Sequence, residues 1–422
     1  MKPYPAYKDS GIEWIGKIPK EWKNSKIKHV LMLLYKSKLE ASEGKEEGLY
    51  PFFTSSIEQN KFIDFAIFDD ECLIMGDGGQ ASINYCEGKF STSSHCLVFK
   101  KQKNISLKFI YYQILSNINI INDLGFSGIG LKNIQKDFFY NMNIFYPDLD
   151  EQKIITGFLD KKICQIDTII SKKEKIIELL KEERVAIINE AVTKGLNPNA
   201  EMKDSGIEWI GKIPKHWETR KLKFMASVRF SNVDKKYSEG EQAIRLCNYV
   251  DVYNNNSITS EMDFMQATAS PEEIQKYLLK AGDIIVTKDS EEWQDICIPA
   301  YVTADFFDVL CGYHLAQIRP KLANGKYLFW LLSSNSINYQ YVIEATGVTR
   351  YGIGNYALKN SLILIPSENE QIKIATYLDL KMAWINIQIE MITKAIDYLK
   401  EYRTALISEV VTGKIDVRGY AV

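Results

Sequence analysis

Three absences limit what this chain of 422 residues can be. No apolar run approaches the roughly 20 residues that a membrane-spanning helix requires, and the opening MKPYPAYKDSG lacks the apolar core of a signal peptide. The seven cysteines are an odd number and include no Cys-x-x-Cys pair, which argues against a disulfide framework and against a zinc cluster. These absences predict a cytoplasmic globular protein with buried, unpaired thiols.

Arginine is also scarce, and it is unevenly placed. Of the eight arginines, the first is Arg184, so the preceding segment relies on lysine for positive charge. The formal net charge is −2, whereas a free-standing nucleic-acid binder is usually basic overall. A DNA-binding function would therefore require locally gathered basic residues, or partners that supply much of the phosphate contact.

What the chain does contain is repetition. The segment KDSGIEWIGKIPK runs from Lys8 to Lys20 and recurs unchanged from Lys203 to Lys215, with a tryptophan two residues after each copy. Thirteen identical residues are not a chance match, and a repeated tight turn would be degenerate rather than identical. We infer that a partner meets both copies in the same way, which makes Trp14, Lys17, Trp209 and Lys212 the partner-docking candidates.

A second repeat lies at a different offset, 219 residues. PDLDEQKIITGFLDKK from Pro147 resembles PSENEQIKIATYLDLK from Pro366, and LKEERVAIINEAVT from Leu180 resembles LKEYRTALISEVVT from Leu399. Apolar residues recur in both stretches at steps of three, four and seven, which is typical of a stripe on a long helix that packs against a partner helix. The matched stripes are Ile155, Leu159, Ile166, Ile170, Ile177, Leu180, Ile187 and Ala191, and Ile374, Leu378, Ile385, Ile389, Ile396, Leu399, Leu406 and Val410.

The length predicts two domains, and the repeats indicate where they lie. The predicted parts are a first repeat segment (1–20), a domain (21–147), a long helix (148–194), a linker with the second repeat segment (195–215), a second domain (216–366), a second long helix (367–412) and a tail (413–422). Both domains alternate short strand-like apolar runs with turns and short helices, although their sequences barely resemble each other. We expect a mixed α/β fold, with two α/β domains separated by two long helices that pack as an antiparallel coiled coil with pseudo-twofold symmetry.

This arrangement resembles the specificity subunit of type I restriction–modification systems. The resemblance covers nearly the whole chain, and its carriers are the repeated KDSGIEWIGKIPK segments, the Pro-x-x-x-Glu-Gln openings of both long helices and Leu-Lys-Glu-x-Arg near their ends. It implies two target-recognition domains that read a split, asymmetric DNA target at a spacing set by the helices. It also implies no catalysis and no cofactor in this chain. The implied partners are double-stranded DNA, two modification subunits that methylate adenine with S-adenosylmethionine, and restriction subunits that need ATP and Mg²⁺.

Other hypotheses stay open. One is a two-headed interaction scaffold that binds no DNA. Another is a latent adenine methyltransferase, because the residues Phe126 to Gly130 resemble the F-x-G-x-G loop that holds S-adenosylmethionine; the chain lacks, however, the Asn/Asp-Pro-Pro-Tyr/Phe segment that grips a flipped adenine. A third is a nuclease, since Asp70 with Glu87-Gly88-Lys89 loosely matches a metal-binding motif. The four histidines show no ligand spacing, although His95 and His314 precede similar apolar runs and hint at a shared domain fold.

Base edges are read by Arg, Lys, Asn, Gln and Ser/Thr, and phosphates are bound by lysine, hydroxyl groups and backbone amides. The DNA-binding candidates therefore lie in polar loops between the strand-like runs, where ordinary turn chemistry is the alternative explanation. They are Gly76, Asp77, Gly78, Gln80, Ser82, Ser93, Ser94, Ser127, Lys132 and Asn133 in the first domain, and Lys288, Ser290, Trp293, Gln294, Thr346, Arg350, Tyr351 and Asn355 in the second. Arg350 is favoured as a base reader because glycines flank its loop and leave it free to enter a groove.

Overall fold

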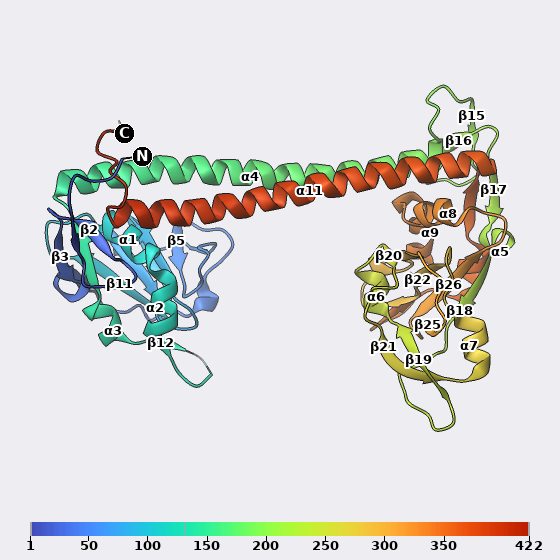
Figure 1. Ribbon diagram of the computed structural model, residues 1–422, viewed down its shortest axis with the longest axis horizontal. Coiled ribbons are helices and arrows are strands. Elements are labelled where there is room, and N and C mark those ends of the chain that lie inside the picture. Colours follow the sequence, from blue (N-terminus) through green and yellow to red (C-terminus); the bar gives the residue numbers. More distant parts are fainter. Residues whose placement is uncertain (1, 131, 421–422) are drawn as a thin grey trace. The chain divides into compact units, whose positions relative to one another are not determined.

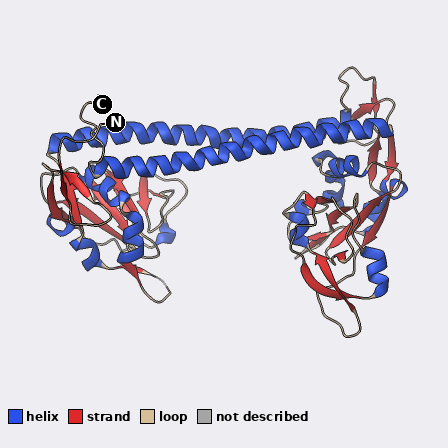
Figure 2. Cartoon of the chain, viewed as in Figure 1, coloured by secondary structure: helices blue, strands red, loops and turns tan. Residues whose placement is uncertain are grey.

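The computed structural model describes residues 2–130 and 132–420, and it forms two compact units. The first unit is Met1–Glu174 with Thr393–Val422, and the second is Lys175–Ile392. The long helices are α4 (Leu149–Lys194) and α11 (Glu368–Val411) (Figures 1 and 2). The boundary between the units falls within both helices, so each unit holds one α/β domain, the start of one helix and the end of the other.

The two long helices pack on each other within each unit, as the coiled-coil pattern predicts. In the second unit, Leu180 and Ile188 of α4 share a core with Leu378 and Ile385 of α11. None of the sixteen predicted stripe residues is exposed. Because each unit joins the start of one helix to the end of the other, the pairing is antiparallel, and the predicted fold class is confirmed.

The glutamines of the two Glu-Gln pairs fasten the helix starts to the domains. The side-chain oxygen of buried Gln152 accepts a hydrogen bond from the N–H of Ser106 at 2.9 Å, and its amide donates to the carbonyl of Pro147 at 2.9 Å. Gln371 makes the same pair of bonds, with the N–H of Asn324 at 2.8 Å and the carbonyl of Pro366 at 3.0 Å. Ser106 and Asn324 are the N-caps of the domain helices α1 (Leu107–Ser116) and α8 (Gly325–Leu332).

The first domain contains two four-stranded sheets. In spatial order, one comprises β4 (Leu31–Leu33), β11 (Cys96–Lys101), β8 (Cys72–Gly76) and β9 (Ile83–Cys86), all antiparallel. The other comprises β6 (Phe62–Ile63), β5 (Tyr50–Phe53), β10 (Lys89–Thr92) and β7 (Phe68–Asp69), in which β5 and β10 are parallel. Ile74 faces the second sheet, whereas Leu73 and Met75 face the core under the helices α1, α2 (Ile118–Gly125) and α3 (Lys136–Asn141). This alternation follows from the two-residue period of a strand buried on both faces.

The second domain is built in the same way from different residues. Its larger sheet comprises, in spatial order, β18 (Ala226–Phe230), β26 (Leu315–Pro320), β22 (Ile284–Thr287), β24 (Pro299–Val302) and β20 (Ser257–Ile258). The smaller sheet comprises β21 (Met265–Ala269), β19 (Gln242–Cys247) and β25 (Val309–Cys311). Its helices are α5 (Leu222–Met225), α6 (Tyr249–Tyr253), α7 (Pro271–Tyr277), α8, α9 (Asn335–Glu344) and α10 (Asn355–Asn360). Ile285 packs into one core, and Ile284 and Val286 into the other.

A two-stranded ladder closes each domain by joining its first and last strands. In the first domain β3 (Lys23–Lys26) pairs with β14 (Asn143–Tyr146). In the second, β17 (Glu218–Lys221) pairs with β28 (Leu362–Ile365). The strand-like runs of the sequence thus become β8, β11 and β14 in the first domain and β22, β26 and β28 in the second.

The repeated segments form two hairpins with the same register. Strands β1 (Tyr7–Asp9) and β2 (Lys17–Pro19) pair in the first copy, and β15 (Met202–Asp204) and β16 (Lys212–Pro214) in the second. The first hairpin lies against the end of α11. A side chain at Gly413, whose φ is +70°, would bring its Cβ within 2.3 Å of Cδ of Pro19, so this helix end requires glycine.

Candidate DNA interface

A pair of antiparallel strands lies inside each domain, and each pair borders a polar loop. In the first domain, the N–H of Asp77, directly after β8, donates to the carbonyl of His95, directly before β11, at 3.0 Å. In the second, the N–H of Lys288, after β22, donates to the carbonyl of His314, before β26, also at 3.0 Å. Two domains with little sequence similarity therefore share a frame, as the placement of the two histidines predicts.

A hairpin from later in the first domain is attached to the loop after β8. Strand β12 (Phe126–Ser127) pairs with β13 (Asn133–Ile134), and the N–H of Ile134 donates to the carbonyl of Asp77 at 3.0 Å. Loop and hairpin therefore form one polar surface from two candidate loops that are about fifty residues apart in the sequence. Figure 1 shows β12 on the side of the first unit opposite to helix α4.

The second domain repeats this attachment. Strand β27 (Tyr351–Gly352) pairs with β23 (Asp289–Ser290), and the N–H of Ile353 donates to the carbonyl of Lys288 at 2.9 Å. The two candidate loops of this domain are thus also joined into one surface. The sequence singles out both loops in each domain as candidates, but it gives no indication that they pair.

A carboxylate lies beneath each of these surfaces and contacts the frame histidine. Asp77 Oδ2 pairs with Lys36 Nζ at 2.6 Å, and Asp77 Oδ1 lies 3.4 Å from His95 Nδ1. Within the described ranges, this buried Oδ1 accepts no hydrogen bond. Lys36 was not predicted as a site residue, because it comes from a separate loop and shares no motif with Asp77 or His95.

In the second domain the carboxylate is Asp289, whose Oδ2 lies 2.7 Å from Lys288 Nζ and 3.1 Å from His314 Nδ1. Asp77 and Asp289 lie in matching turns after β8 and β22, but they are one residue out of register, because the backbone counterpart of Asp77 is Lys288. The bridge partner of Gly352 is Asp289, whereas in the first domain the equivalent bridge is made by Gly78. A contact between an aspartate and the frame histidine is therefore common to both domains, but the aspartate lies one residue later in the turn of the second domain.

The predicted DNA-binding residues divide by exposure. Nine are exposed: Gln80, Ser127, Lys132, Asn133, Trp293, Gln294, Thr346, Arg350 and Asn355. Asp77, Ser94 and Tyr351 are partly exposed. Six are buried and expose little of their surface: Gly76, Gly78, Ser82, Ser93, Lys288 and Ser290.

The buried candidates have structural reasons for their residue types. Gly76 lies where an added Cβ would approach Oγ of Ser82 to 2.6 Å, so glycine permits close packing there. Ser82 donates to the carbonyl of Ser55 at 3.3 Å. Ser290 shares a hydrogen bond of 3.0 Å with the hydroxyl of Tyr249.

Two further buried candidates, Ser93 and Lys288, are fixed by contacts within their domains. The N–H of Ser93 donates to the carbonyl of Phe53 at 2.8 Å, which places Ser93 in the first domain's sheet framework. Lys288 Nζ lies 4.5 Å from the centre of the Tyr313 ring, in addition to its pairing with Asp289. With these contacts, the ammonium group of Lys288 lies below the surface of the domain and does not project toward a DNA groove.

Four of the five arginines in the second domain form hydrogen bonds or ion pairs within the domain. Their partners are Glu218 for Arg220, the carbonyl of Lys276 for Arg229, Asp308 for Arg245 and Asp283 for Arg319. Arg350 differs, because the ion pair that it forms with Glu291 is long, at 3.9 Å between Nη2 and Oε1. The selection of Arg350 as the favoured base reader stays a prediction.

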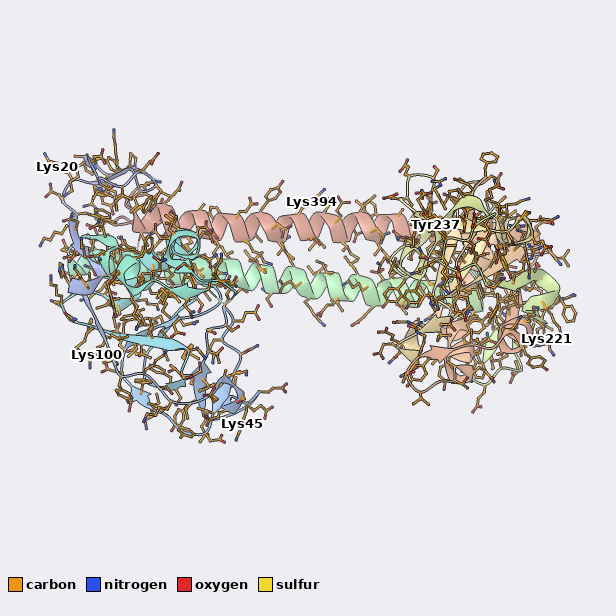
Figure 3. The ribbon with its side chains drawn as sticks, turned by 90° about the horizontal axis from the view of Figure 1, so that it is seen from below. Lys20, Lys45, Lys100, Lys221, Tyr237 and Lys394 are labelled. Carbon is orange, nitrogen blue, oxygen red and sulfur yellow. The ribbon has the colours of Figure 1, made fainter. Side chains whose placement is uncertain are left out.

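Some lysines of the first domain also form ion pairs within the protein. Lys100, labelled in Figure 3, forms an ion pair with Asp70, and Lys101 Nζ lies 2.8 Å from Glu71 Oε2. The hydrogen bond from Lys100 lowers the pKa of the Asp70 carboxyl. Asp70, which the nuclease hypothesis used, therefore belongs to an ion pair of the sheet surface.

The cysteines are mostly inert thiols. Five are buried, Cys86 is partly exposed and Cys164 is exposed on α4, which corrects the expectation that all are buried. Burial raises the pKa of Cys72 and of Cys96 to about 11, so that Cys96 is not activated by the neighbouring His95. Across the described residues, no group of three or more His, Cys, Asp or Glu side chains is placed to hold a metal ion, and no helix is long and apolar enough to cross a membrane.

Comparison with known proteins identifies the family. The model of the family described as "Type I restriction modification DNA specificity domain" matches residues 19–180 and 214–397, one copy in each half of the chain. The chain belongs to this family. The prediction from the repeats is thereby confirmed, and so is the expectation of a specificity subunit rather than an enzyme.

Curated relatives in this specificity family match along the chain. The MjaVIII type I restriction enzyme specificity subunit of Methanocaldococcus jannaschii is 24% identical, over 95% of this chain and 95% of its own length. The EcoKI specificity subunit of Escherichia coli strain K12 is 22% identical, over 95% of this chain and 90% of its own length. The EcoDI specificity subunit of Escherichia coli is 23% identical, over 79% of this chain and 75% of its own length.

Solved structures show the same fold. A chain from a structure titled for complex assembly and conformational transition of the type I R-M system has a TM-score of 0.69 at 11% identity, covering 94% of this chain and 99% of that chain. The HsdS subunit from Thermoanaerobacter tengcongensis has a TM-score of 0.53 at 13% identity, covering 94% and 98%. At these identities, the likeness concerns the fold alone.

The docking candidates of this specificity-family chain lie on the surface. Trp14 and Trp209 are 51% and 42% exposed, and Lys17 and Lys212 are exposed. Trp14 lines an open pocket of about 440 Å³. Trp209 is partly held by its own domain, because its Nε1 donates to the carbonyl of Ser336 at 3.0 Å.

The tryptophans that follow each repeat are core residues instead. Trp22 is buried, and its Nε1 donates to Glu151 Oε1 at 3.1 Å. Trp217 is buried too, but no acceptor in the described part of the chain meets its Nε1. Here Glu370, the counterpart of Glu151, pairs with His216 at 2.8 Å. Each repeat therefore presents one tryptophan to its surroundings and buries the next.

Proposed function

We propose that this chain is the DNA-specificity subunit of a type I restriction–modification complex and reads a split, asymmetric target. The observation that carries the proposal is that both domains build an exposed polar surface on the same frame, with different residues in it. A shared frame suits two domains that approach DNA alike. Unlike side chains suit two half-sites of different sequence.

The spacing of the half-sites would follow from the helix pair. Helices α4 and α11 join the two domains without a proline or a glycine between Lys162 and Lys194 or anywhere in α11. Dimeric DNA readers fix the half-site distance through their own geometry. In this chain, the coiled coil of α4 and α11 would set the distance between the two domains, and with it the distance between the half-sites.

The partners of this proposal are two modification subunits and the restriction subunits. Two identical exposed segments support two copies of one partner, since each copy would meet the same residues.

Helix α11 adds a second apolar stripe, separate from the one buried against α4. Its members are Leu380, Trp384, Ile387 and Met391, between 48% and 69% exposed and spaced by four, three and four residues. Figure 3 shows the side chains that project from α11 around Lys394. An exposed apolar stripe of this kind marks a protein interface.

The chemistry would reside in those partners. S-adenosylmethionine, ATP and Mg²⁺ would bind to the modification and restriction subunits, and this chain would hold no cofactor. The complex would act in the cytoplasm, where foreign DNA enters.

The test is reconstitution with the modification subunit. We expect the complex to methylate adenine only within one split sequence, and the isolated chain to bind no S-adenosylmethionine in calorimetry. Methylation that does not depend on this chain would contradict the proposal. Stable assembly with a partner, without any preference for a DNA sequence, would favour the two-headed scaffold instead.

A further inference from the structure

The two most exposed large apolar side chains among the described residues occupy equivalent positions in the two domains. They are Ile129, at 107% of its reference exposure, and Val348, at 95%. They are 219 residues apart, which is the offset of the long-helix repeat. Each lies in the hairpin that is attached to the polar loop, within Ser127-Gly128-Ile129 and Thr346-Gly347-Val348 respectively.

The conformation that presents these side chains is also shared. Gly128 has φ of 150° and Gly347 has φ of 152°, a region that is essentially restricted to glycine. At Gly347, a Cβ would lie 1.9 Å from the carbonyl oxygen of Arg350, so no other residue fits. Behind each tip, Ile134 and Ile353 are buried in their domains. The exposure is therefore the product of a defined turn on an anchored hairpin.

The positions beside the tips differ between the domains. Lys132 corresponds to Tyr351 and Asn133 to Gly352, as expected where each domain reads its own bases. The apolar tip and the glycine before it are kept. Because the apolar tip is present in both domains, we expect it to act in a step that both half-sites share. Under the proposed function, that step is the delivery of an adenine to a modification subunit.

An adenine inside a duplex is out of reach of an active site, so it must be flipped out of the stack at a cost of a few kcal/mol. Proteins reduce such costs by inserting apolar side chains between base pairs, where they replace part of the lost stacking. Isoleucine and valine suit this role because branching at Cβ leaves them few rotamers to lose. Glycines on both sides of Ile129 also keep the tip narrow enough for a groove.

We propose that Ile129 and Val348 are wedges, each of which unstacks the duplex beside the adenine that is methylated in its half-site. The proposal rests on the proposed function. It assigns the two tips to the deformation of DNA rather than to the recognition of a base.

The experiment uses the complete complex with its modification subunits and measures methyl transfer at each half-site separately. Ile129→Ala should slow transfer at one adenine by on the order of tenfold and leave the other unchanged, and Val348→Ala should do the reverse. A mismatch opposite the affected adenine should restore the rate, because the base then no longer needs the wedge to leave the stack. The fluorescence of 2-aminopurine at the target position should fall in the alanine variants, since the base stays stacked.

Matched controls separate the wedge from a general effect. Leu49→Ala and Phe307→Ala remove exposed apolar side chains elsewhere in the same domains, 74% and 90% exposed, and should leave both rates unchanged. Ile129→Val should keep most of the activity. Thermal melting of each variant should match that of the unsubstituted chain, because the tips are exposed.

Three results would overturn the wedge. They are an unchanged rate in the alanine variants, an equal loss on matched and mismatched duplexes, and a changed base preference. The last would make the tip a base-reading contact. Failure of the unsubstituted complex to methylate any split site is a different result, which would remove the proposed function itself.

Discussion

Replacing Arg350 by alanine is expected to relax the recognition of one base pair in the half-site read by the second domain. Its guanidinium is exposed on a hairpin that is anchored to the domain frame through Ile353 and Lys288. An arginine that pairs with both O6 and N7 of guanine is the commonest specific contact with DNA. The hairpin therefore offers a positioned reader rather than a flexible charge.

The size of the effect follows from two free energies, that of the ion pair with Glu291 that Arg350 loses and that of the contact with guanine that it gains. Its side chain is 51% exposed and that of Glu291 is 84% exposed, at a separation of 3.9 Å. An ion pair of this kind contributes no more than about 1 kcal/mol and is easily broken. A two-pronged contact with guanine is worth about 1–3 kcal/mol. Because 1.4 kcal/mol corresponds to a factor of ten, the base preference should fall by roughly 5-fold to 150-fold.

The assay is equilibrium binding of the complex to the target and to its single-base variants at two salt concentrations. Arg350→Lys keeps the charge but loses the planar pairing, and it should behave like the alanine variant in base preference. Arg220→Ala removes an arginine with the same 51% side-chain exposure and should leave the preference intact. A uniform loss over all DNA, with a salt slope lowered by about one, would make Arg350 a phosphate contact. Unchanged affinity and preference would exclude it from the interface.

Three more predictions concern assembly, spacing and stability. Joint replacement of Trp14 and Trp209 by alanine should abolish co-elution with the modification subunit while thermal melting still shows a cooperative transition of the folded chain; full assembly would refute docking at the repeats. Inserting seven residues after Lys173 and after Ile392 keeps the stripe in phase and adds about 10 Å, so mapped methylation sites should show the gap lengthened by about three base pairs, and an unchanged gap would exclude the helices as the spacer. Gln152→Ala should lower the free energy of unfolding by about 1–3 kcal/mol in denaturant titrations, because it leaves the partly buried N–H of Ser106 and the buried carbonyl of Pro147 without partners; an unchanged midpoint would show that water replaces the side chain.

The fold was predictable where a periodic pattern carried the information. The stripe from Ile155 to Ala191 specifies a helix and its buried face without reference to any distant residue. The central residues of β8 (Leu73–Met75) and of β22 (Ile284–Val286) are all apolar because both faces of each strand are buried. Pro147 and Pro366 precede the long helices and Gly195 and Gly413 follow them, and each lies within two residues of the observed helix end.

The interface was predictable only in part, because burial of a polar side chain depends on contacts that lie far away in the sequence. Ser93 and Ser290 resemble ordinary loop residues, yet the backbone of one and the hydroxyl of the other are bonded inside the domain. Lys288 is buried against the carboxylate of the next residue, Asp289, and against the ring of Tyr313 from a distant segment. One signal was available: Gly128-Ile129 and Gly347-Val348 are aligned by the helix offset of 219 residues, and this alignment would have paired the two hairpins.

The most direct test of the central claim is an exchange of one domain. Residues 216–366 would be replaced by the equivalent domain of a relative in the family, and methylated adenines would be mapped in DNA modified by the complex. If each domain reads its own half-site, the half-site of the first domain and the gap will be retained, and the other half-site alone will change. Simultaneous change of both half-sites, or retention of the original sequence, would contradict the account.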